Sequence, residues 1–260
     1  MPEASSSISS FFPRIRRFVD KAFLICKSYF ICFKVQKLRR NIAGKDVLIL
    51  GSAPNPVLPK YFHAMPLICC NGSAANASDL SLQSPVMTVV DYELIDEHES
   101  KAKDVRSVII DSGYLRGLDL GELVATQSND AKGGKPEILQ ANYSRFLEIS
   151  RFERRRMIDL LTNTRLLERD RRTSLCSTGA FAVALAFYLG AKSVTLSGFT
   201  YFVSSDVSNA DEINSINTRS HSMADSMLLG LATINGKVIQ TGERDLLPVI
   251  QNYGNEGPKW

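Results

Sequence analysis

Short apolar runs recur along the chain after residue 44, and they predict the strands of a buried sheet. Unbroken apolar runs are typical of parallel strands that are covered on both faces. Most of these runs end in Gly, Ser, Asn or Asp, which are residues that turn the chain. We expect strands at 47–50, 66–70, 86–90, 105–110, 193–196 and 238–240.

Helical patterns lie between these runs. We expect a polar, arginine-rich helix over 141–172, mostly solvated, an Ala-rich apolar helix over 180–189, and a last helix over 222–235. Strands that alternate with helices predict the α/β class, with an open, mostly parallel Rossmann-like sheet and helices on both faces. The polar stretch at about 199–220 has no periodicity, and we expect it to form a mobile lid.

The first 40 residues combine positive charge with large apolar side chains. They hold nine Lys or Arg and two acidic residues, and lysines interrupt every long apolar run. This pattern favours a basic amphipathic helix in the headgroup layer of an anionic membrane over a spanning helix or a secretory signal. We therefore divide the chain into a membrane-surface segment, 1–43, and a folded domain, 44–260. The alternative is a helix that packs on the protein's own core or on a partner subunit.

Composition and cysteine content narrow the class of protein. Of the 260 residues, 44% are hydrophobic, which is enough to bury a core. The five cysteines are an odd number without a Cys-x-x-Cys pair, so they suit neither a disulfide framework nor a zinc site. We expect a cytoplasmic protein, peripheral on the inner face of the cell membrane.

Polar or glycine-rich segments follow most predicted strands, and in a parallel sheet these strand ends form one edge where ligands bind. The loop at 51–55 lacks the Gly-x-Gly-x-x-Gly of a dinucleotide site, so a nicotinamide enzyme is not expected. It is either a nucleotide-binding loop or an ordinary turn. The helix start at 177–179 suits a phosphate or a carboxylate, or is an ordinary helix cap. The other polar strand ends are 71–73, 91–93 and 197–198.

Taken in order, these segments resemble the bacterial sialyltransferases, a glycosyltransferase family (family 42) that uses cytidine-monophosphate (CMP) donors. The similarity covers roughly residues 45–250. Gly51-Ser-Ala-Pro resembles the family's Gly-Asn-Gly-Pro loop, and Cys-Cys-Asn71 resembles its Arg-Cys-Asn. The most specific match runs from Ser-Thr-Gly179 through Leu-Gly190 to Leu-Ser-Gly198, in the family's order and spacing. His221 follows the predicted lid and precedes a helix.

The resemblance implies roles for the matched residues. Ser177, Thr178 and Gly179 would bind the donor's carboxylate or phosphate, and His221 would be the general base on the acceptor hydroxyl. A histidine suits that role because its unperturbed pKa of about 6.5 lies near working pH. His63 and His98 are expected to be surface residues. The implied donor-binding residues are Gly51, Ser52, Ala53, Asn55, Asn71, Ser177, Thr178, Gly179, Ser197, Gly198 and Tyr201.

Three positions depart from the family pattern. Leu175 stands where the family carries an arginine, Phe202 aligns with a phosphate-binding tyrosine, and Asp91 replaces an asparagine. As a second catalytic residue, Asp91 could attack the anomeric carbon and give retention, as in the retaining Kdo transferases that the chain also resembles. Asp91 with Glu93 could instead bind a divalent metal, or Asp91 could cap a helix.

The expected function is transfer of a 2-keto acid sugar, sialic-acid-type or Kdo, from its CMP donor to a glycan or glycolipid hydroxyl in cell-surface polysaccharide synthesis. The alternatives are a metal-dependent nucleotide-sugar transferase and a non-catalytic CMP-sugar-binding protein of the same fold. We expect no cofactor and no metal. The expected partners are the CMP-activated sugar, the acceptor and an anionic membrane surface, without nucleic acid, in a chain that could form a homo-oligomer.

Overall fold

The computed structural model describes residues 34–52, 56–92, 95, 113–126, 135–163, 176–199 and 224–241. The chain divides into two compact units, residues 1–37 and 38–260, and the second unit holds the sheet. None of the helices described in these ranges is long and apolar enough to cross a membrane. The expected lid at 199–220 falls almost wholly outside the described residues, as does the first unit up to residue 33.

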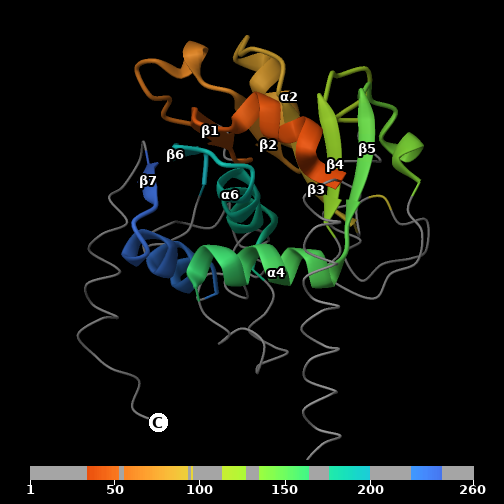
Figure 1. Cartoon of the computed structure of the whole chain (residues 1–260). Coiled ribbons are helices and arrows are strands. Elements are labelled where there is room, and N and C mark those ends of the chain that lie inside the picture. Colours follow the sequence, from red (N-terminus) through yellow and green to blue (C-terminus); the bar gives the residue numbers. More distant parts are fainter. Residues whose placement is uncertain are drawn as a thin grey trace, which may run out of the picture. The chain divides into compact units, whose positions relative to one another are not determined.

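The second unit is built on an open sheet of seven parallel strands, in the order β5-β4-β3-β2-β1-β6-β7 (Figure 1). This confirms the predicted α/β class with a Rossmann-like parallel sheet. The strands are β1 (Asp46–Leu50), β2 (Leu67–Cys70), β3 (Met87–Asp91), β4 (Glu122–Thr126), β5 (Arg145–Ile149), β6 (Ser193–Ser197) and β7 (Val238–Thr241).

Five of the strands fall on predicted apolar runs, and two do not. β4 was not predicted, and the strand expected at 105–110 lies outside the described residues. The single helix expected over 141–172 is wrong in its first part, because 145–149 form β5. β5 pairs with β4 alone, at the end of the sheet, and its sequence Arg-Phe-Leu-Glu-Ile mixes polar with apolar residues, so the apolar run is not continuous.

The helix that follows β5 begins at a well-defined signal. Ser150 accepts a hydrogen bond from the Glu153 N–H, and the Glu153 carboxylate accepts one from the Ser150 N–H. This reciprocal capping box satisfies two backbone donors that the first helical turn leaves without partners. It starts α4 (Arg151–Thr162), which ends at Asn163 in the left-handed conformation (φ 50°).

Helices lie on both faces of the sheet. On one face, side chains of β1 to β4, such as Leu48 and Leu123, share a core with Ala74 and Ala77 of the short helix α2 (Ser73–Asp79). On the other face lies α6 (Thr178–Tyr188), which contacts β1, β2, β3 and β6 and is buried at ten of its eleven residues. α4 packs over α6, and this explains why α6 is apolar all round (Figure 1).

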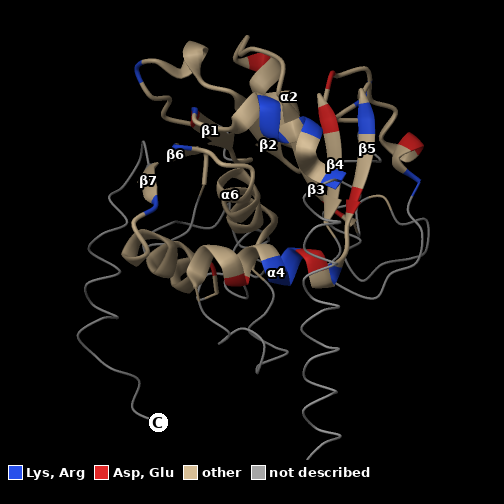
Figure 2. Cartoon of the chain, in the orientation of Figure 1, with Lys and Arg blue, Asp and Glu red and all other residues tan. Residues whose placement is uncertain are grey.

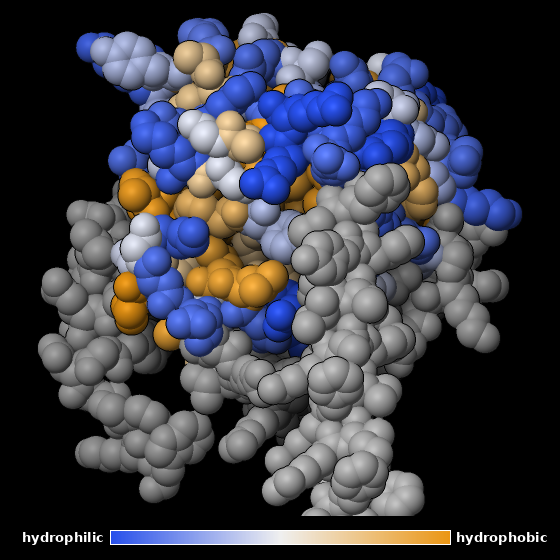
Figure 3. Space-filling model, viewed as in Figure 1, coloured by the Kyte–Doolittle hydropathy of each residue, from blue (hydrophilic) through white to orange (hydrophobic). Residues whose placement is uncertain are grey.

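The remaining described elements are shorter or lie near the ends. Helices cover 34–42 and 224–234, the latter within the span predicted at 222–235, and two 3₁₀ turns are η1 (Phe62–Ala64) and η4 (Pro136–Leu139). Leu38 and Ile42 are completely buried, so the second unit already begins within the 34–42 helix. Hydrophobic side chains reach the surface where α4 and the 224–234 helix lie, among them Leu160 and Ile234 (Figure 3).

Candidate functional site

The strand order reverses between β1 and β6. From β1 the chain adds β2, β3, β4 and β5 on one side, and then returns to place β6 on the other side of β1. In open parallel sheets such a switch point leaves a crevice beyond the strand ends, where ligands bind. Those parts of the singled-out segments that the structure describes lie along this carboxyl edge, which faces α4 in Figure 1.

At the switch point itself, glycines allow the backbones of β1 and β6 to touch. A Cβ atom on Gly51 would lie 2.2 Å from the Gly198 carbonyl oxygen, and one on Gly179 would lie 2.3 Å from a ring carbon of Phe199. Gly198 has a φ of 72°, a conformation that glycine adopts without strain. The Phe199 ring therefore lies between the end of β1 and the start of α6, and these glycines are required by the chain's own packing.

A serine side chain joins the ends of β1 and β2. The Ser73 hydroxyl donates to the Leu50 carbonyl at 2.7 Å and accepts from the Cys70 N–H at 2.7 Å. The next residue after β2, Asn71, takes the left-handed conformation (φ 51°). Its side-chain oxygen accepts a hydrogen bond from the Asp91 N–H at 3.0 Å. Asn71 and Asp91, predicted from separate strand ends, are therefore direct neighbours, and the Asn71 oxygen holds the end of β3.

Asp91 also stands opposite Thr126, because the last residues of β3 and β4 are paired in register. Side chains alternate along a strand, and Val90 and Ala125 belong to the core on the α2 face, so Asp91 and Thr126 are directed to the face that α4 and α6 cover. There the Arg154 guanidinium of α4 donates from Nη1 to the Thr126 hydroxyl at 2.7 Å. The carboxylate and the guanidinium thus lie at neighbouring strand ends.

Arg154 links the sheet edge to the segment that precedes α6. Its Nη2 donates to the Cys176 carbonyl oxygen and lies 3.5 Å from the Cys176 sulfur, and the guanidinium stacks over the Phe181 ring at 5.2 Å. Arg154 is only 4% exposed, and its Nε has no hydrogen-bond partner among the described residues. Burying a charged side chain in this way is costly unless it is held by several polar groups. Figure 2 shows that the basic residues of α4 lie in its half nearest β5.

The start of α6 offers two backbone donors. Ser177 caps the helix, since its hydroxyl accepts from the Ala180 N–H at 3.1 Å, while its own N–H donates to the Asp225 carboxylate at 2.7 Å. The N–H groups of Thr178 and Gly179 have no partner among the described residues. They lie at the N-terminus of α6, where the positive end of the helix dipole favours anions. Asp225, 3% exposed, already accepts from the neighbouring N–H, that of Ser177, so a ligand at this helix start is limited to these two donors.

Charges around Cys176 act in opposite directions on its thiol. Burial raises the pKa of Cys176, and the Asp225 carboxylate raises it further, whereas the Arg154 guanidinium lowers it. The thiol is therefore the protonated form at neutral pH, and Cys176 is not prepared as a nucleophile. The polar groups at this edge include the Asp91 carboxylate, the Asn71 amide and the two N–H groups of α6.

Several predicted site residues lie outside the described residues. They are Ala53, Asn55, Tyr201 and His221, together with Glu93, Leu175 and Phe202. Ser52 is exposed and follows Gly51, and the Ser197 hydroxyl turns away from the α6 face, donating to the Val57 carbonyl at 2.6 Å. His63 lies exposed in η1, as expected. In the described ranges no group of three or more His, Cys, Asp or Glu is placed to bind a metal ion.

Sequence reasoning missed Arg154, Thr126 and Asp225. The arginines of 141–172 were expected to lie mostly on a solvated face, and this is wrong for Arg154. A signal was present, because Arg154 shares a helical stripe with Met157, Ile158 and Leu161, all buried. No local pattern in the sequence marks Thr126 or Asp225.

No protein-family model matches the chain, and no curated protein matches it.

Proposed function

We propose that this protein is a glycosyltransferase that moves a 2-keto acid sugar from its CMP donor to a glycan or glycolipid hydroxyl. One observation carries the proposal: segments far apart in the sequence, each matching part of the sialyltransferase pattern, adjoin one another along one sheet edge. Contacts join Gly198 to Gly51, the ends of β1 and β2 through Ser73, Asn71 to Asp91, and Thr126 through Arg154 to the segment before α6.

The chemistry requires two kinds of group, and both are represented at this edge. As the bond to CMP breaks, the phosphate takes up negative charge and the sugar ring becomes positive. The Thr178 and Gly179 N–H groups, at the positive end of the α6 dipole, suit the phosphate or the sugar's carboxylate. The Asp91 carboxylate, at the end of β3, suits the positive anomeric carbon.

Asp91 has three possible roles within this proposal. It attacks the anomeric carbon and forms a glycosyl-enzyme, it stabilises the positive ring without bonding, or it binds a metal with Glu93. The first role gives retention and suits a Kdo donor, whereas the second suits an inverting transferase in which His221 removes the acceptor's proton. The Asn71 side chain accepts a hydrogen bond from the Asp91 N–H and so fixes the Asp91 backbone. This favours a role in which the carboxylate must be held at one position.

The N-terminal unit would place the enzyme beside a lipid-linked acceptor on the inner face of the cell membrane. Nine Lys or Arg in the first 40 residues supply the charge for anionic lipids. Because Leu38 and Ile42 are buried in the second unit, a truncation that tests this should stop at residue 33. We expect that variant to fold and to lose salt-sensitive binding to anionic liposomes. Undiminished flotation would refute the membrane role.

A panel of nucleotide sugars tests the proposal directly. We expect CMP-activated sialic acid or Kdo to raise the melting temperature of the full-length protein, since a ligand at 100 times its Kd stabilises by about 2.7 kcal/mol. UDP-sugars should have no such effect. Release of CMP on incubation with the donor separates a transferase from a protein that only binds the donor. If no CMP-sugar stabilises the chain or is hydrolysed, the proposal is wrong.

A further inference from the structure

A hollow of about 640 Å³ lies at the opposite ends of the strands from the proposed donor site. It is formed by the amino ends of β1 and β6, by β7, and by the connection after β1 that includes Pro59 and Met65. Its volume falls within the range of small-molecule sites, about 300–1,000 Å³. The hollow opens on the same sheet face that α2 covers further along the sheet. Thr195, which lines the hollow, is paired in register with Leu48, and the Leu48 side chain belongs to the core that α2 shares.

Strand β6 forms the floor of this hollow, and its side chains there are unusually polar for a strand inside a parallel sheet. On this face β6 presents only hydroxyl side chains, those of Ser193, Thr195 and Ser197. Ser193 donates to Asp46 at 2.6 Å and Ser197 donates to the Val57 carbonyl at 2.6 Å. Thr195, 4% exposed, lies between them, and its hydroxyl has no partner among the described residues. Because Thr195 lines the hollow, its hydroxyl can donate to or accept from a ligand that binds there.

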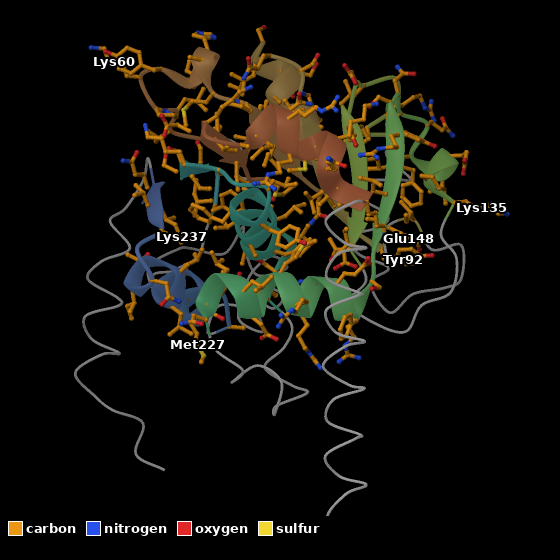
Figure 4. All side chains as sticks on the ribbon, viewed as in Figure 1. Lys60, Tyr92, Lys135, Glu148, Met227 and Lys237 are labelled. Atoms are coloured by element: carbon orange, nitrogen blue, oxygen red, sulfur yellow. The ribbon has the colours of Figure 1, made fainter. Side chains whose placement is uncertain are left out.

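The rim is positively charged. Lys45, Lys60 and Lys192 line the hollow, against one carboxylate, that of Asp46. Asp46 is already engaged by Ser193 and by Lys192 at 3.4 Å, and these contacts lower its pKa, with the Ser193 hydrogen bond the largest cause. Lys45 and Lys60 have no carboxylate partner among the described residues, and Figure 4 shows Lys60 extending outward from its loop. The excess positive charge favours an anion.

Two further groups suit a sugar. The Tyr61 ring is 72% exposed at the rim, with Lys60 Nζ 5.6 Å from its centroid, and an exposed ring can stack on the apolar face of a pyranose. From β7, the exposed amide of Gln240 has no partner within the described structure and can bond to hydroxyls. We propose that this hollow is a second binding site, for a monosaccharide unit that carries a phosphate or a carboxylate.

This inference stands apart from the proposed transfer reaction, because the hollow shares no residue with the carboxyl edge. The probes are glucose 1-phosphate and glucuronate, titrated into the full-length protein by calorimetry, with glucose and inorganic phosphate as the single-feature controls. We expect saturable binding of at least one acidic sugar and weaker binding of both controls. Absence of binding at millimolar probe, or equal binding of inorganic phosphate, would overturn the proposal.

Matched variants locate the site. We expect Thr195→Val, which keeps the shape of the side chain and removes the hydroxyl, to weaken binding about 10-fold. The double change Lys45→Gln with Lys60→Gln should do the same without touching the buried strand. Lys237→Gln removes one positive charge, where the double variant removes two, from a position beside Phe187 on the other face of the sheet, and should have no effect. Equal losses in Lys237→Gln and in the Lys45/Lys60 variant would show that net charge alone is responsible, and would sink the proposal, as would unchanged binding in Thr195→Val.

Discussion

At the β1/β6 junction the carboxyl edge is closed by the chain itself, whereas beside β3 and β4 it holds buried charge. At the junction, Gly51, Gly179 and Gly198 leave room for backbone and for the Phe199 ring. Beside β3 and β4, Arg154 is held by two polar groups and faces the strand end that carries Asp91. Both regions lie at one edge, and the sequence predicted donor-binding glycines at the first and a catalytic Asp91 at the second.

The difference separates residues that the fold needs from residues that it does not. Each glycine of the junction is explained by an atom that a Cβ would strike, so its presence gives no independent support for a nucleotide. The carboxylate of Asp91 is not explained in this way, because a strand end can be closed by any turn-forming residue. Function should therefore respond most to changes beside β3, and stability to changes at the junction.

The largest expected effect is that of Asp91→Asn on transfer. We expect at least about a 10³-fold loss of kcat with little change in melting temperature, because the substitution keeps the shape and removes the charge that meets the positive ring. Asp79→Asn, at the exposed end of α2, is the control and should leave both quantities unchanged. The comparison needs a measured transfer reaction, followed with the donor that the panel identifies.

A second observation divides the roles of Asp91. If it attacks the anomeric carbon, donor without acceptor should add the mass of one sugar to the peptide that contains Asp91, and chelators should have no effect. If it binds a metal, chelation should stop turnover without an adduct. Full activity in Asp91→Asn would return Asp91 to a structural role and remove the contrast between the two regions.

At the junction the expected effect is on stability. Gly51→Ala and Gly179→Ala should each cost about 1–3 kcal/mol of unfolding free energy, as overpacked sites do. Adding Phe199→Leu should rescue Gly179→Ala, whose clash is with a ring, and should not rescue Gly51→Ala, whose clash is with a backbone carbonyl. Denaturant unfolding measures both. Gly236→Ala, which has open space but a φ of 77°, shows the cost of losing glycine alone.

Arg154→Lys tests the link between the two regions. A lysine cannot reach Thr126 and Cys176 together with the fixed fork of a guanidinium, so we expect a loss of about 2 kcal/mol. Arg155→Lys is the matched control on the next residue, which is half-buried, and should change stability by less than about 0.5 kcal/mol. Equal stabilities of the two variants would show that Arg154 does not hold the start of α6.

The smallest effect concerns thiol chemistry. Burial raises the pKa of Cys69 to about 12 from 9.0, so its thiolate is about 10³-fold scarcer than in an ordinary thiol near pH 8. The pKa of Cys176 is also raised by burial, but the Arg154 guanidinium opposes the shift. We expect iodoacetamide to label both slowly in the folded protein, with Cys176 ahead of Cys69 as pH rises. Peptide mass spectrometry gives the order, and the reverse order would contradict the charge assignment.

The sequence predicted the sheet well where burial is complete. Val47 to Leu50 of β1 are covered on both faces, and a continuous run of apolar residues is what such a strand requires. Prediction failed at the end of the sheet, where β5 is a short run of mixed polar and apolar residues within an arginine-rich segment. It also failed for β4, whose first residue, Glu122, is buried because Arg145 of β5 pairs with it.

The candidate site was predictable only in part, for the same physical reason. Strand ends rich in Gly, Ser and Asn are local signals, and Gly51, Asn71, Asp91 and Gly198 were found from them. Arg154 and Asp225 act at the edge because of packing between distant elements, which no local pattern records. Pairing of such buried charges depends on the assembled core.

The pairing of β1 with β6 also determines when the carboxyl edge of the sheet can form during synthesis. Asp46 and its partner Ser193 are 147 residues apart, so one edge of β1 stays open while all of β2 to β5 is made. At about 5–20 residues per second this lasts roughly 7–30 s. An unpaired apolar strand edge is prone to pairing with other chains. The nascent protein is therefore most vulnerable to aggregation before α6 and β6 emerge, and rare codons just ahead of them would lengthen that interval.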